Sequence, residues 1–413
     1  MVVVAQLGAR MHYAVPRILH RSGMLERLYT DIYAPPLPKP LQTWVSKYGP
    51  ASFRRWMGRV PANIPEKKII SFTAMGLEYY KRRKSAAAHG SATSAHLWAG
   101  QELCRRVIHR GLGAAEAVFT YNSAGLELLE YAQSRHVYAI TEQTSAPHRI
   151  YGKILSEERT NYSQWTLAPV EDPLHRAFEE REQMEWSTAD LILCGSEFVR
   201  EGIRLMGGPV ERCRVVPYGV HPPDSIEPRD CRNKPLRVLI VGAVQIMKGS
   251  HYALAAARTL RGKAEFRMAG QLDVTAEAER MLSKHVTLLG AVPRSEIHRQ
   301  FKWADVFLLP TLCEGSATVC YEALSYGLPV ITTPNAGSVV RDGLDGFIVP
   351  IRDTSAVVDR IERFVDDNDV WATMSANART RASEFTLERY GERLLSVLAV
   401  ETQRERDYAN TPA

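Results

Sequence analysis

The sequence lacks several features that would assign it to common protein classes. It has 413 residues and no run of about 18 apolar residues, so no membrane-spanning helix is predicted. Its start, MVVVAQLGAR, has neither the charged nor the long apolar stretch of a secretory signal, and Val2–Ala5 is expected to form a first strand. The six cysteines include no C-x-x-C pair and no neighbouring histidine ligand. This argues against structural zinc and favours free thiols in a reducing cytosol.

The composition is that of a soluble globular protein, with 45% apolar and 24% charged residues, and the length predicts two domains. The net charge of +6 is unevenly spread, because residues 47–84 hold ten lysines or arginines and two glutamates. Aromatic residues alternate with these basic ones from residue 43 onward. Such a segment suits an anionic membrane surface or an acidic acceptor. A solvated insertion whose aromatics pack on the domain explains the pattern equally well. Nucleic acid is not expected, because no binding motif accompanies the charge.

Residues 306–350 contain the most informative pattern. The apolar run Val306–Leu309 predicts a buried parallel strand, a loop with Glu314 follows, and residues 317–326 have a helical pattern that ends at Gly327. A second buried strand, Val330–Thr332, comes next. The segment therefore predicts one βαβ unit with a carboxylate where the first strand ends.

Two glutamates in this unit, Glu314 and Glu322, stand eight residues apart, and the predicted helix begins between them. Free amides at a helix N-terminus attract anions. A phosphate flanked by hydroxyl groups fits this arrangement, and a nucleotide sugar is such a ligand. Spacing alone leaves open an ordinary βαβ unit with two solvated glutamates.

The same segment resembles the E-x7-E signature of retaining glycosyltransferases of sequence family four, also called glycosyl transferases group 1. The similarity continues through AL-S-YG-LPVI and DG-L-DGFIV, over about 40 residues. It departs at Ser338, where relatives often carry another acid. The resemblance implies the GT-B fold, in which two Rossmann-like α/β domains face a cleft and a C-terminal helix crosses back to the N-terminal domain.

The N-terminal half shows alternating strand and helix patterns, with a second strand expected at Thr30–Tyr33. These patterns predict a doubly wound parallel sheet. The turn at Gly8 to Arg10 lies where the family places a loop beneath the donor phosphates. In many relatives the strand corresponding to VYAIT ends in a histidine that touches the donor sugar, and here Glu142 stands there. Either Glu142 contacts a sugar hydroxyl, or His148 takes that place from the next loop, or Glu142 is simply solvated.

The C-terminal half opens with the strand RVLIV and a loop at residues 242–249 that has neither dinucleotide-binding nor P-loop spacing. The loop resembles the family's G-R-x4-K-G loop, in which both basic residues meet the diphosphate. Lys248 matches, but Ala243 replaces the arginine. One cation fewer would stabilise the leaving group less, unless Arg10, the helix start or another arginine compensates.

The expected organisation follows from these patterns and from the resemblance. It comprises an acceptor-side domain at 1–220 with the basic insertion at about 34–84, a proline-rich linker at 221–235, a donor-binding domain at 236–384, a crossing helix at 385–401 and a flexible tail at 402–413.

The predicted activity is retaining transfer of a sugar from a nucleotide-sugar donor to a hydroxyl acceptor, such as a glycan, a lipid-linked precursor or a polysaccharide precursor. No metal or other cofactor is expected, because no strand-end loop carries an Asp-x-Asp pair. The resemblance implies that the departing phosphate takes the acceptor's proton, so no dedicated protein base is required. The catalytic candidates are Glu314, Lys248 and Glu142. The donor-binding candidates are Gly8, Arg10, Gly242, Lys248, Gly290, Val292, Glu314, Gly315, Ser316, Ala317, Thr318 and Glu322.

Two other activities remain open at this stage. One is a nucleotide-sugar epimerase of the same fold, and the other is a catalytically weak subunit that binds a nucleotide sugar. The expected location is the cytoplasm, with peripheral attachment at the inner face of the membrane through the basic segment.

Overall fold

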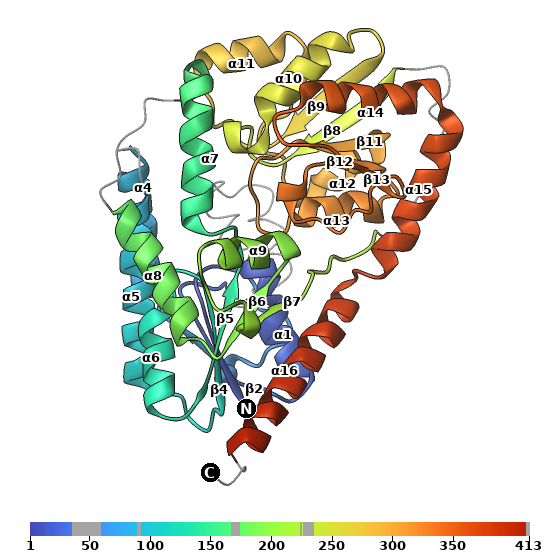
Figure 1. Cartoon of the computed structure of the whole chain (residues 1–413). Helices are drawn as coiled ribbons and strands as arrows, with labels where there is room; N and C mark the ends of the chain where they lie inside the picture. Colours follow the sequence, from blue (N-terminus) through green and yellow to red (C-terminus); the bar gives the residue numbers. More distant parts are fainter. Residues whose placement is uncertain (35–58, 89–91, 167–173, 224, 226–234, 410–413) are drawn as a thin grey trace, which may run out of the picture.

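The computed structural model describes residues 1–34, 59–88, 92–166, 174–223, 225 and 235–409. Two parallel β-sheets, each covered by helices, form two α/β domains that lie one above the other in Figure 1. This confirms the predicted fold class of two Rossmann-like domains. Among the described residues, no helix is both long enough and apolar enough to cross a membrane.

The N-terminal sheet has seven strands in the order β3-β2-β1-β4-β5-β6-β7. Their bounds are β1 Val2–Gln6, β2 Leu25–Thr30, β3 Ile69–Ser71, β4 Ala117–Tyr121, β5 Tyr138–Gln143, β6 Leu191–Cys194 and β7 Cys213–Val215. The helices of this half are α1 Ala14–Arg21, α4 Thr73–Ala88, α5 Thr93–Arg110, α6 Leu126–Ser134, α7 His148–Asn161, α8 His175–Thr188 and α9 Glu197–Leu205. Its central strands are buried along their whole length because helices cover both faces of the sheet.

The C-terminal sheet has six strands in the order β10-β9-β8-β11-β12-β13. Their bounds are β8 Leu236–Val241, β9 Ala264–Ala269, β10 Val286–Leu288, β11 Val306–Leu309, β12 Val330–Thr332 and β13 Gly346–Ile348. The helices are α10 Ser250–Thr259, α11 Ala276–Ser283, α12 Arg294–Trp303, α13 Thr318–Ser325, α14 Thr354–Asp366, α15 Asn368–Ser383 and α16 Leu387–Ala409. Short 3-10 helices are η1 Arg10–Tyr13, η2 Glu66–Lys68, η3 Ser163–Trp165, η4 Val210–Arg212, η5 Ile246–Lys248 and η6 Pro334–Ala336.

Each sheet reverses its strand order beside its first strand. In the N-terminal sheet β1 lies between β2 and β4, and in the C-terminal sheet β8 lies between β9 and β11. Ligands of open parallel sheets bind outside the carboxyl ends of the strands at such a switch point. The loops after β1 and β4, and those after β8 and β11, are therefore where a ligand is expected.

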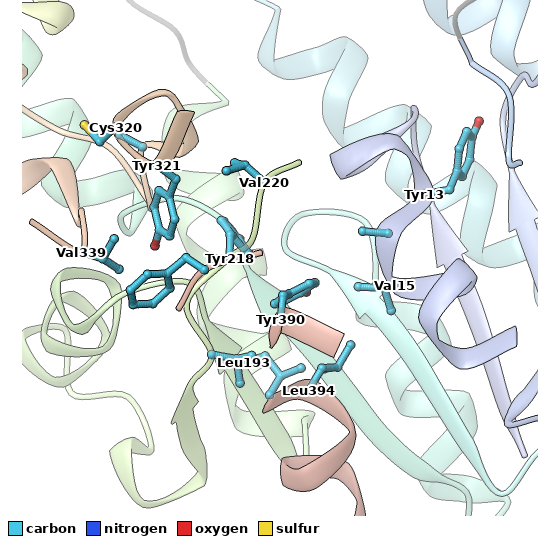
Figure 2. Close-up of a cluster of buried hydrophobic side chains, with 14 of the residues drawn as sticks. Tyr13, Val15, Leu193, Tyr218, Val220, Cys320, Tyr321, Val339, Tyr390 and Leu394 are labelled. Carbon is cyan, nitrogen blue, oxygen red and sulfur yellow. The ribbon is translucent and has the colours of Figure 1, made fainter. Parts of the chain in front are cut away.

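The C-terminal helix α16 crosses back to the N-terminal domain, as predicted. Figure 2 shows Tyr390 and Leu394 of α16 beside Leu193 of β6 and Tyr218. Arg214 Nε donates to Glu401 Oε1 at 2.8 Å near the far end of the contact. The helix continues to Ala409, so it extends past residue 401, where we expected it to end.

Helix α7 is a second connection between the domains. By chain order it belongs to the N-terminal domain, yet Tyr151, Ile154 and Leu155 pack against the hydrophobic core of the C-terminal sheet. The fully buried Glu158 accepts hydrogen bonds from His251 Nε2 and the Tyr252 hydroxyl, each at 3.0 Å. In Figure 1 the helix extends toward α10 and α11.

Two sequence-based expectations of the N-terminal half need adjustment. The second strand is Leu25–Thr30 rather than residues 30–33, because the buried Leu25, Leu28 and Tyr29 pair with β1. Part of the expected insertion is β3, which forms the edge of the sheet. Residues 35–58, including Lys47, Arg54 and Arg55, lie outside the described residues.

Candidate active site between the two sheets

Glu314 lies in the loop after β11 and is paired with Lys248 from the loop after β8. The Lys248 ammonium donates to Glu314 Oε1, and Thr311 Oγ1 donates to the same oxygen at 3.2 Å. Both charged side chains are partly exposed, 20% for Lys248 and 18% for Glu314. The structure therefore brings together the two residues that the sequence placed 66 positions apart.

Close backbone packing fixes the position of Lys248. Gly249, directly after it, has a φ of +71° and lies against Pro310, so that a Cβ built there would overlap the Pro310 carbonyl oxygen. Gly242 begins the same loop with a φ of +144°. A Cβ built on it would lie 3.6 Å from Cε of Lys248. Glycine is needed where the backbone is left-handed and where two backbone segments approach each other this closely. The two loops are thereby held in one relative position.

The helix start after Glu314 offers fewer ligand-binding amides than expected. The Ala317 amide donates to the Ala336 carbonyl at 3.0 Å, so it is not available to a ligand in this conformation. The Ser316 hydroxyl bonds to the Tyr321 hydroxyl at 2.8 Å. The amides of Gly315, Ser316 and Thr318 donate to no acceptor within the described residues. Three amides at the start of α13 are thus left for an outside acceptor, and a helix N-terminus favours an anion.

Glu322, in α13, is paired with an arginine that we did not predict. Arg294 Nη2 lies 3.1 Å from Glu322 Oε1, and burial raises the pKa of the Glu322 carboxyl while Arg294 opposes that rise. Arg294 begins α12, just after the loop that contains Gly290 and the half-buried Val292. The Gly290 carbonyl accepts from the Gly270 amide at 2.8 Å.

The residues from these loops form one side of the site, which we call the C-terminal face: Gly242, Lys248, Gly290, Val292, Arg294, Glu314, Gly315, Ser316, Ala317, Thr318 and Glu322. Ala243 contributes no charge, as the sequence showed. Arg294 supplies a cation to the same face.

The opposite side, the N-terminal face, begins with the loop after β1. The Gly8 amide donates to Asp31 Oδ1 at 2.9 Å, and Gly8 has a φ of +72°. Arg10 Nη1 donates to Thr144 Oγ1 at 3.0 Å, and its guanidinium lies 5.0 Å from the centre of the Tyr121 ring. The loop therefore places Arg10 at the carboxyl ends of β4 and β5.

The same loop has an unusual backbone. Three consecutive residues, Met11, His12 and Tyr13, have φ values of 44°, 53° and 60°. Left-handed conformations of non-glycine residues cost on the order of 1–3 kcal/mol each and cluster at ligand sites. Burial and the nearby Arg294 charge lower the pKa of His12, which places the loop close to the C-terminal face.

Glu142, the penultimate residue of β5, is buried. The Tyr218 hydroxyl donates to its Oε1 at 2.6 Å, whereas its Oε2 is buried without a partner in the structure as described. Burial raises the pKa of the Glu142 carboxyl to about 7, against the effect of the Tyr218 hydrogen bond. Beside it is a cavity of about 220 Å³ lined by Arg10, Met11, Val15, Tyr121, Glu142, Thr144 and Tyr218.

His148 does not line this cavity. Its Nε2 lies 2.9 Å from His175 Nδ1, and its ring packs 4.4 Å from that of Phe178, both on the α8 side. The structure thus favours Glu142 over His148 as the polar residue of the cavity.

Direct contacts join the two faces at Gly315. Ser196 Oγ donates to the Gly315 carbonyl at 2.5 Å, and the Ala146 amide donates to the Glu314 carbonyl at 3.2 Å. A Cβ on Gly315 would overlap the carbonyl oxygen of Thr144. Thr144 lines the cavity and also touches the loop of Glu314, so the N-terminal cavity and the C-terminal face belong to one site.

Comparison with known proteins identifies the C-terminal domain. Residues 224–381 match the family described as glycosyl transferases group 1. This match covers most of the C-terminal domain. It is similar to the amylovoran biosynthesis glycosyltransferase AmsK of Erwinia amylovora, with 31% identity over 41% of this chain and 46% of AmsK. The putative colanic acid biosynthesis glycosyltransferase WcaL of Salmonella typhimurium is 27% identical over 52% of this chain and 58% of WcaL. The chain thus spans about half the length of the curated relatives that it matches.

Among solved structures, HepE of Anabaena in complex with UDP and glucose has a TM-score of 0.61 at 13% identity, over 97% of this chain and 99% of HepE. This likeness confirms the GT-B fold. The sequence had indicated both the family and the fold. It had not indicated Arg294, Tyr218 or Thr144, because each acts through a partner distant in the chain.

Proposed function

We propose that this protein transfers a sugar, with retention at the anomeric carbon, from a nucleotide-sugar donor to a hydroxyl acceptor in the synthesis of a polysaccharide or its lipid-linked precursor. The observation that carries the proposal is the Lys248–Glu314 pair beside the three unbonded amides at the start of α13. Cation, carboxylate and amides are the groups that a sugar diphosphate needs. The names of AmsK and WcaL support polysaccharide synthesis as the setting.

In this proposal the diphosphate binds at the amides of Gly315, Ser316 and Thr318, and Lys248 moves from Glu314 to the phosphates. As the bond between the anomeric carbon and the phosphate oxygen breaks, negative charge grows on that oxygen, and preorganised cations and amides stabilise it. The same phosphate oxygen then takes the proton of the acceptor hydroxyl, so that proton and charge balance.

In this proposal Glu314 and Glu322 bind different parts of the donor. Glu314 accepts hydrogen bonds from the transferred sugar and stabilises positive charge at its anomeric carbon. Glu322 accepts hydrogen bonds from the ribose hydroxyls, and hydrogen bonds to an ionised acceptor are stronger than neutral ones. Arg294 favours the ionised form of Glu322, against the effect of burial, which raises the pKa of that carboxyl.

We further propose that no metal ion takes part, because Lys248, Arg294 and the helix amides supply the positive charge that a divalent cation would otherwise provide. Activity unchanged by a chelator is the expected result, and restoration of a chelated enzyme by magnesium or manganese would contradict it.

Helix α4 supports peripheral attachment to an anionic membrane at the cytoplasmic face. Leu77 and Tyr80 are 54% and 48% exposed, and Lys81 and Lys84 extend the same stripe at helical spacing. Apolar and basic residues on one exposed stripe are typical of helices that lie on anionic lipid. By contrast, Arg59 is not available to lipid, because it pairs with Asp31 at 3.0 Å.

Liposome co-sedimentation tests this attachment. Binding should require anionic lipid and fall in the double variant Lys81→Gln, Lys84→Gln, but not in Lys153→Gln, Lys302→Gln, which removes two exposed lysines elsewhere. Binding that is equal on neutral and anionic vesicles would count against the proposal.

The main experiment screens donors and then tests Glu314. Thermal shift with UDP-, GDP-, ADP- and dTDP-linked sugars should single out one nucleotide, because a ligand that binds only the folded state raises its stability. With that donor, Glu314→Gln should lose roughly 100- to 1,000-fold in donor turnover. Glu362→Gln is the control, since Glu362 forms an exposed pair with Lys263 on another surface. Full turnover in Glu314→Gln, or no binding by any donor, would refute the proposed function. Transfer that leaves a new glycosidic bond separates it from epimerisation.

A further inference from the structure

Two of the free amides on the C-terminal face belong to peptide units that the N-terminal domain holds by their carbonyls. The Glu314 carbonyl accepts from the Ala146 amide at 3.2 Å, and the Gly315 carbonyl accepts from Ser196 Oγ at 2.5 Å. In a planar trans peptide unit the carbonyl and the following N–H point in opposite directions. Each of these hydrogen bonds therefore also fixes the direction of an amide, that of Gly315 in the first unit and that of Ser316 in the second.

The hydrogen bonds around Ser196 assign the proton of its hydroxyl. Ser196 is the N-cap of α9, where its Oγ accepts from the Val199 amide at 3.3 Å. A backbone amide only donates, so the single hydroxyl proton is left for the Gly315 carbonyl. Because Ser196 is only 6% exposed, little water competes for this bond. One hydroxyl thus caps α9 and holds the loop of Glu314 at the same time.

Glycines let the two domains approach each other closely around this bond. Gly337 has a φ of +57°, and a Cβ built there would lie 2.2 Å from the Gly315 carbonyl oxygen and 2.5 Å from Ser196 Oγ. A Cβ built on Gly195 would lie 3.0 Å from Cβ of Ser316. The start of α9 therefore packs directly on the start of α13, and the bond depends on that packing.

A second N-cap of this protein makes the same pair of hydrogen bonds without a free amide. Thr275 caps α11, and its hydroxyl donates to the Gln164 carbonyl at 2.5 Å. The amide of that peptide unit, Trp165, already donates within its own 3-10 turn at 2.9 Å. The Ser316 amide, by contrast, donates to no acceptor within the described residues. Only the bond from Ser196 thus directs an amide that is left for a ligand.

We propose that Ser196 is a positioning residue of the phosphate site, whose hydroxyl holds the Gly315–Ser316 peptide unit so that the Ser316 amide points at the bound phosphate. This inference rests on the proposed function, in which the diphosphate binds these amides, and adds to that site a side chain of the N-terminal domain. Preorganised donors stabilise growing negative charge without reorienting during the reaction. Phosphate binding is thereby coupled to the contact between the domains, because the amide is aligned only while α9 lies against the loop of Glu314.

Calorimetric titration of the full chain with inorganic pyrophosphate tests the proposal, because this probe requires no knowledge of the nucleobase or the sugar. In Ser196→Ala the Kd of pyrophosphate should rise about tenfold, near the lower end of the effect of losing one hydrogen bond to a charged group. The nucleoside of the donor selected by the screen should bind native protein and variant equally, because it carries no phosphate. Weaker binding of nucleoside and pyrophosphate by the same factor would indicate general damage and overturn the proposal.

Thr275→Ala is the matched control. It removes the same two kinds of hydrogen bond, because Thr275 Oγ1 accepts from the Ala278 amide at 3.2 Å and donates to the Gln164 carbonyl. In Figure 1 its helix α11 lies at the far end of the C-terminal domain from the N-terminal one. Thermal denaturation should show a similar loss of stability in both variants, whereas only Ser196→Ala should weaken pyrophosphate binding. An equal rise of the Kd in both variants would overturn the proposal.

Ser196→Thr separates the hydroxyl from the packing around it. Threonine keeps the donor and is also a good N-cap, so the Kd of pyrophosphate should stay within about twofold of the native value. A rise as large as in Ser196→Ala would assign the effect to packing and overturn the role of the hydroxyl. Native protein that binds neither pyrophosphate nor any donor would refute the proposed function and this inference with it. Native binding with an unchanged Kd in Ser196→Ala would overturn this inference alone.

Discussion

The two faces of the site differ in how their charged side chains are paired and exposed. On the C-terminal face each carboxylate has its own cation, Lys248 for Glu314 and Arg294 for Glu322, and these side chains remain partly exposed. On the N-terminal face Arg10 and Glu142 line one cavity, and each keeps a buried polar atom without a partner among the described residues.

This difference matches two kinds of ligand. Partly exposed ion pairs are weak, so an incoming anion can separate them at little cost and take over the cations. A buried pair with unsatisfied hydrogen-bonding atoms is unsuited to a charged ligand. A hydroxyl that forms a hydrogen bond with each residue would be stabilised there. The C-terminal face is thus suited to a diphosphate and the N-terminal face to an uncharged sugar.

Removing the cation of the C-terminal face should have the largest effect. Lys248→Ala takes away a preorganised charge from the leaving phosphate and should lower turnover roughly 100- to 1,000-fold. Lys263→Ala, on an exposed ion pair of the same domain, should leave turnover unchanged. Steady-state kinetics with the selected donor provides the measurement, and native turnover in Lys248→Ala would show that the phosphate lies elsewhere.

The buried carboxyl of the N-terminal face should make stability depend on pH. Because burial raises the pKa of Glu142 from its ordinary 4.5 to about 7, the folded state binds the proton more tightly than the unfolded state. Its contribution to stability is therefore full below about pH 4.5 and declines as the pH rises through about 7.

Glu142→Gln removes this pH-dependent loss of stability, because an amide side chain does not ionise. Relative to the native protein, the variant should gain about 3 kcal/mol in the free energy of unfolding between about pH 4.5 and about pH 8. Urea denaturation across that range measures the difference, with the exposed Glu180→Gln as control. A difference independent of pH would mean that Glu142 is ionised throughout.

The contact between the faces can be disrupted at Gly315. Gly315→Ala would force a Cβ into the carbonyl of Thr144, and such overpacking costs about 1–3 kcal/mol. Thermal denaturation should show the loss of stability, and the Kd of the nucleotide sugar should rise together with it. Gly391→Ala is the control, because that glycine, like Gly315, is not left-handed and a Cβ there would make only ordinary contacts with Ile18. An equal loss in both variants would deny a special role to the contact.

The smallest effect on stability is expected at Arg294. Its side chain is 70% exposed, so its pair with Glu322 should contribute less than about 1 kcal/mol to folding. Arg294→Ala should still weaken nucleoside diphosphate binding by about tenfold, because a cation is lost near the phosphates. Calorimetric titration measures this, with the exposed Arg299→Ala on the same helix as control. Unchanged binding in Arg294→Ala would show that Arg294 does not replace the cation that is missing at Ala243.

The sequence by itself determined the parallel α/β architecture, the loops that carry Glu314 and Lys248, and the resemblance of its C-terminal half to glycosyl transferases group 1. These rest on local patterns, since buried strands of parallel sheets read as short apolar runs and the E-x7-E segment is contiguous. The same locality explains the errors. The second strand was placed too late because its buried residues are interrupted by Glu26 and Arg27. Helix α13 starts one residue later than its pattern because Ala317, with a ψ of 88°, is the non-helical N-cap residue.

Only the tertiary structure decided which charges are neighbours. Arg294 meets Glu322 across 28 positions, Tyr218 meets Glu142 across 76, and Arg10 meets Thr144 across 134. No local spacing encodes such pairs, because they depend on which strand ends the switch points bring together. Glu142 is buried, with one carboxylate oxygen hydrogen-bonded, and is not a solvated residue at a strand end. This follows from the packing of η1, Tyr218 and α16 around it. The sequence thus indicated most of the charged residues of the site but not Arg294. The fold decided which of these side chains are exposed to water and which are buried.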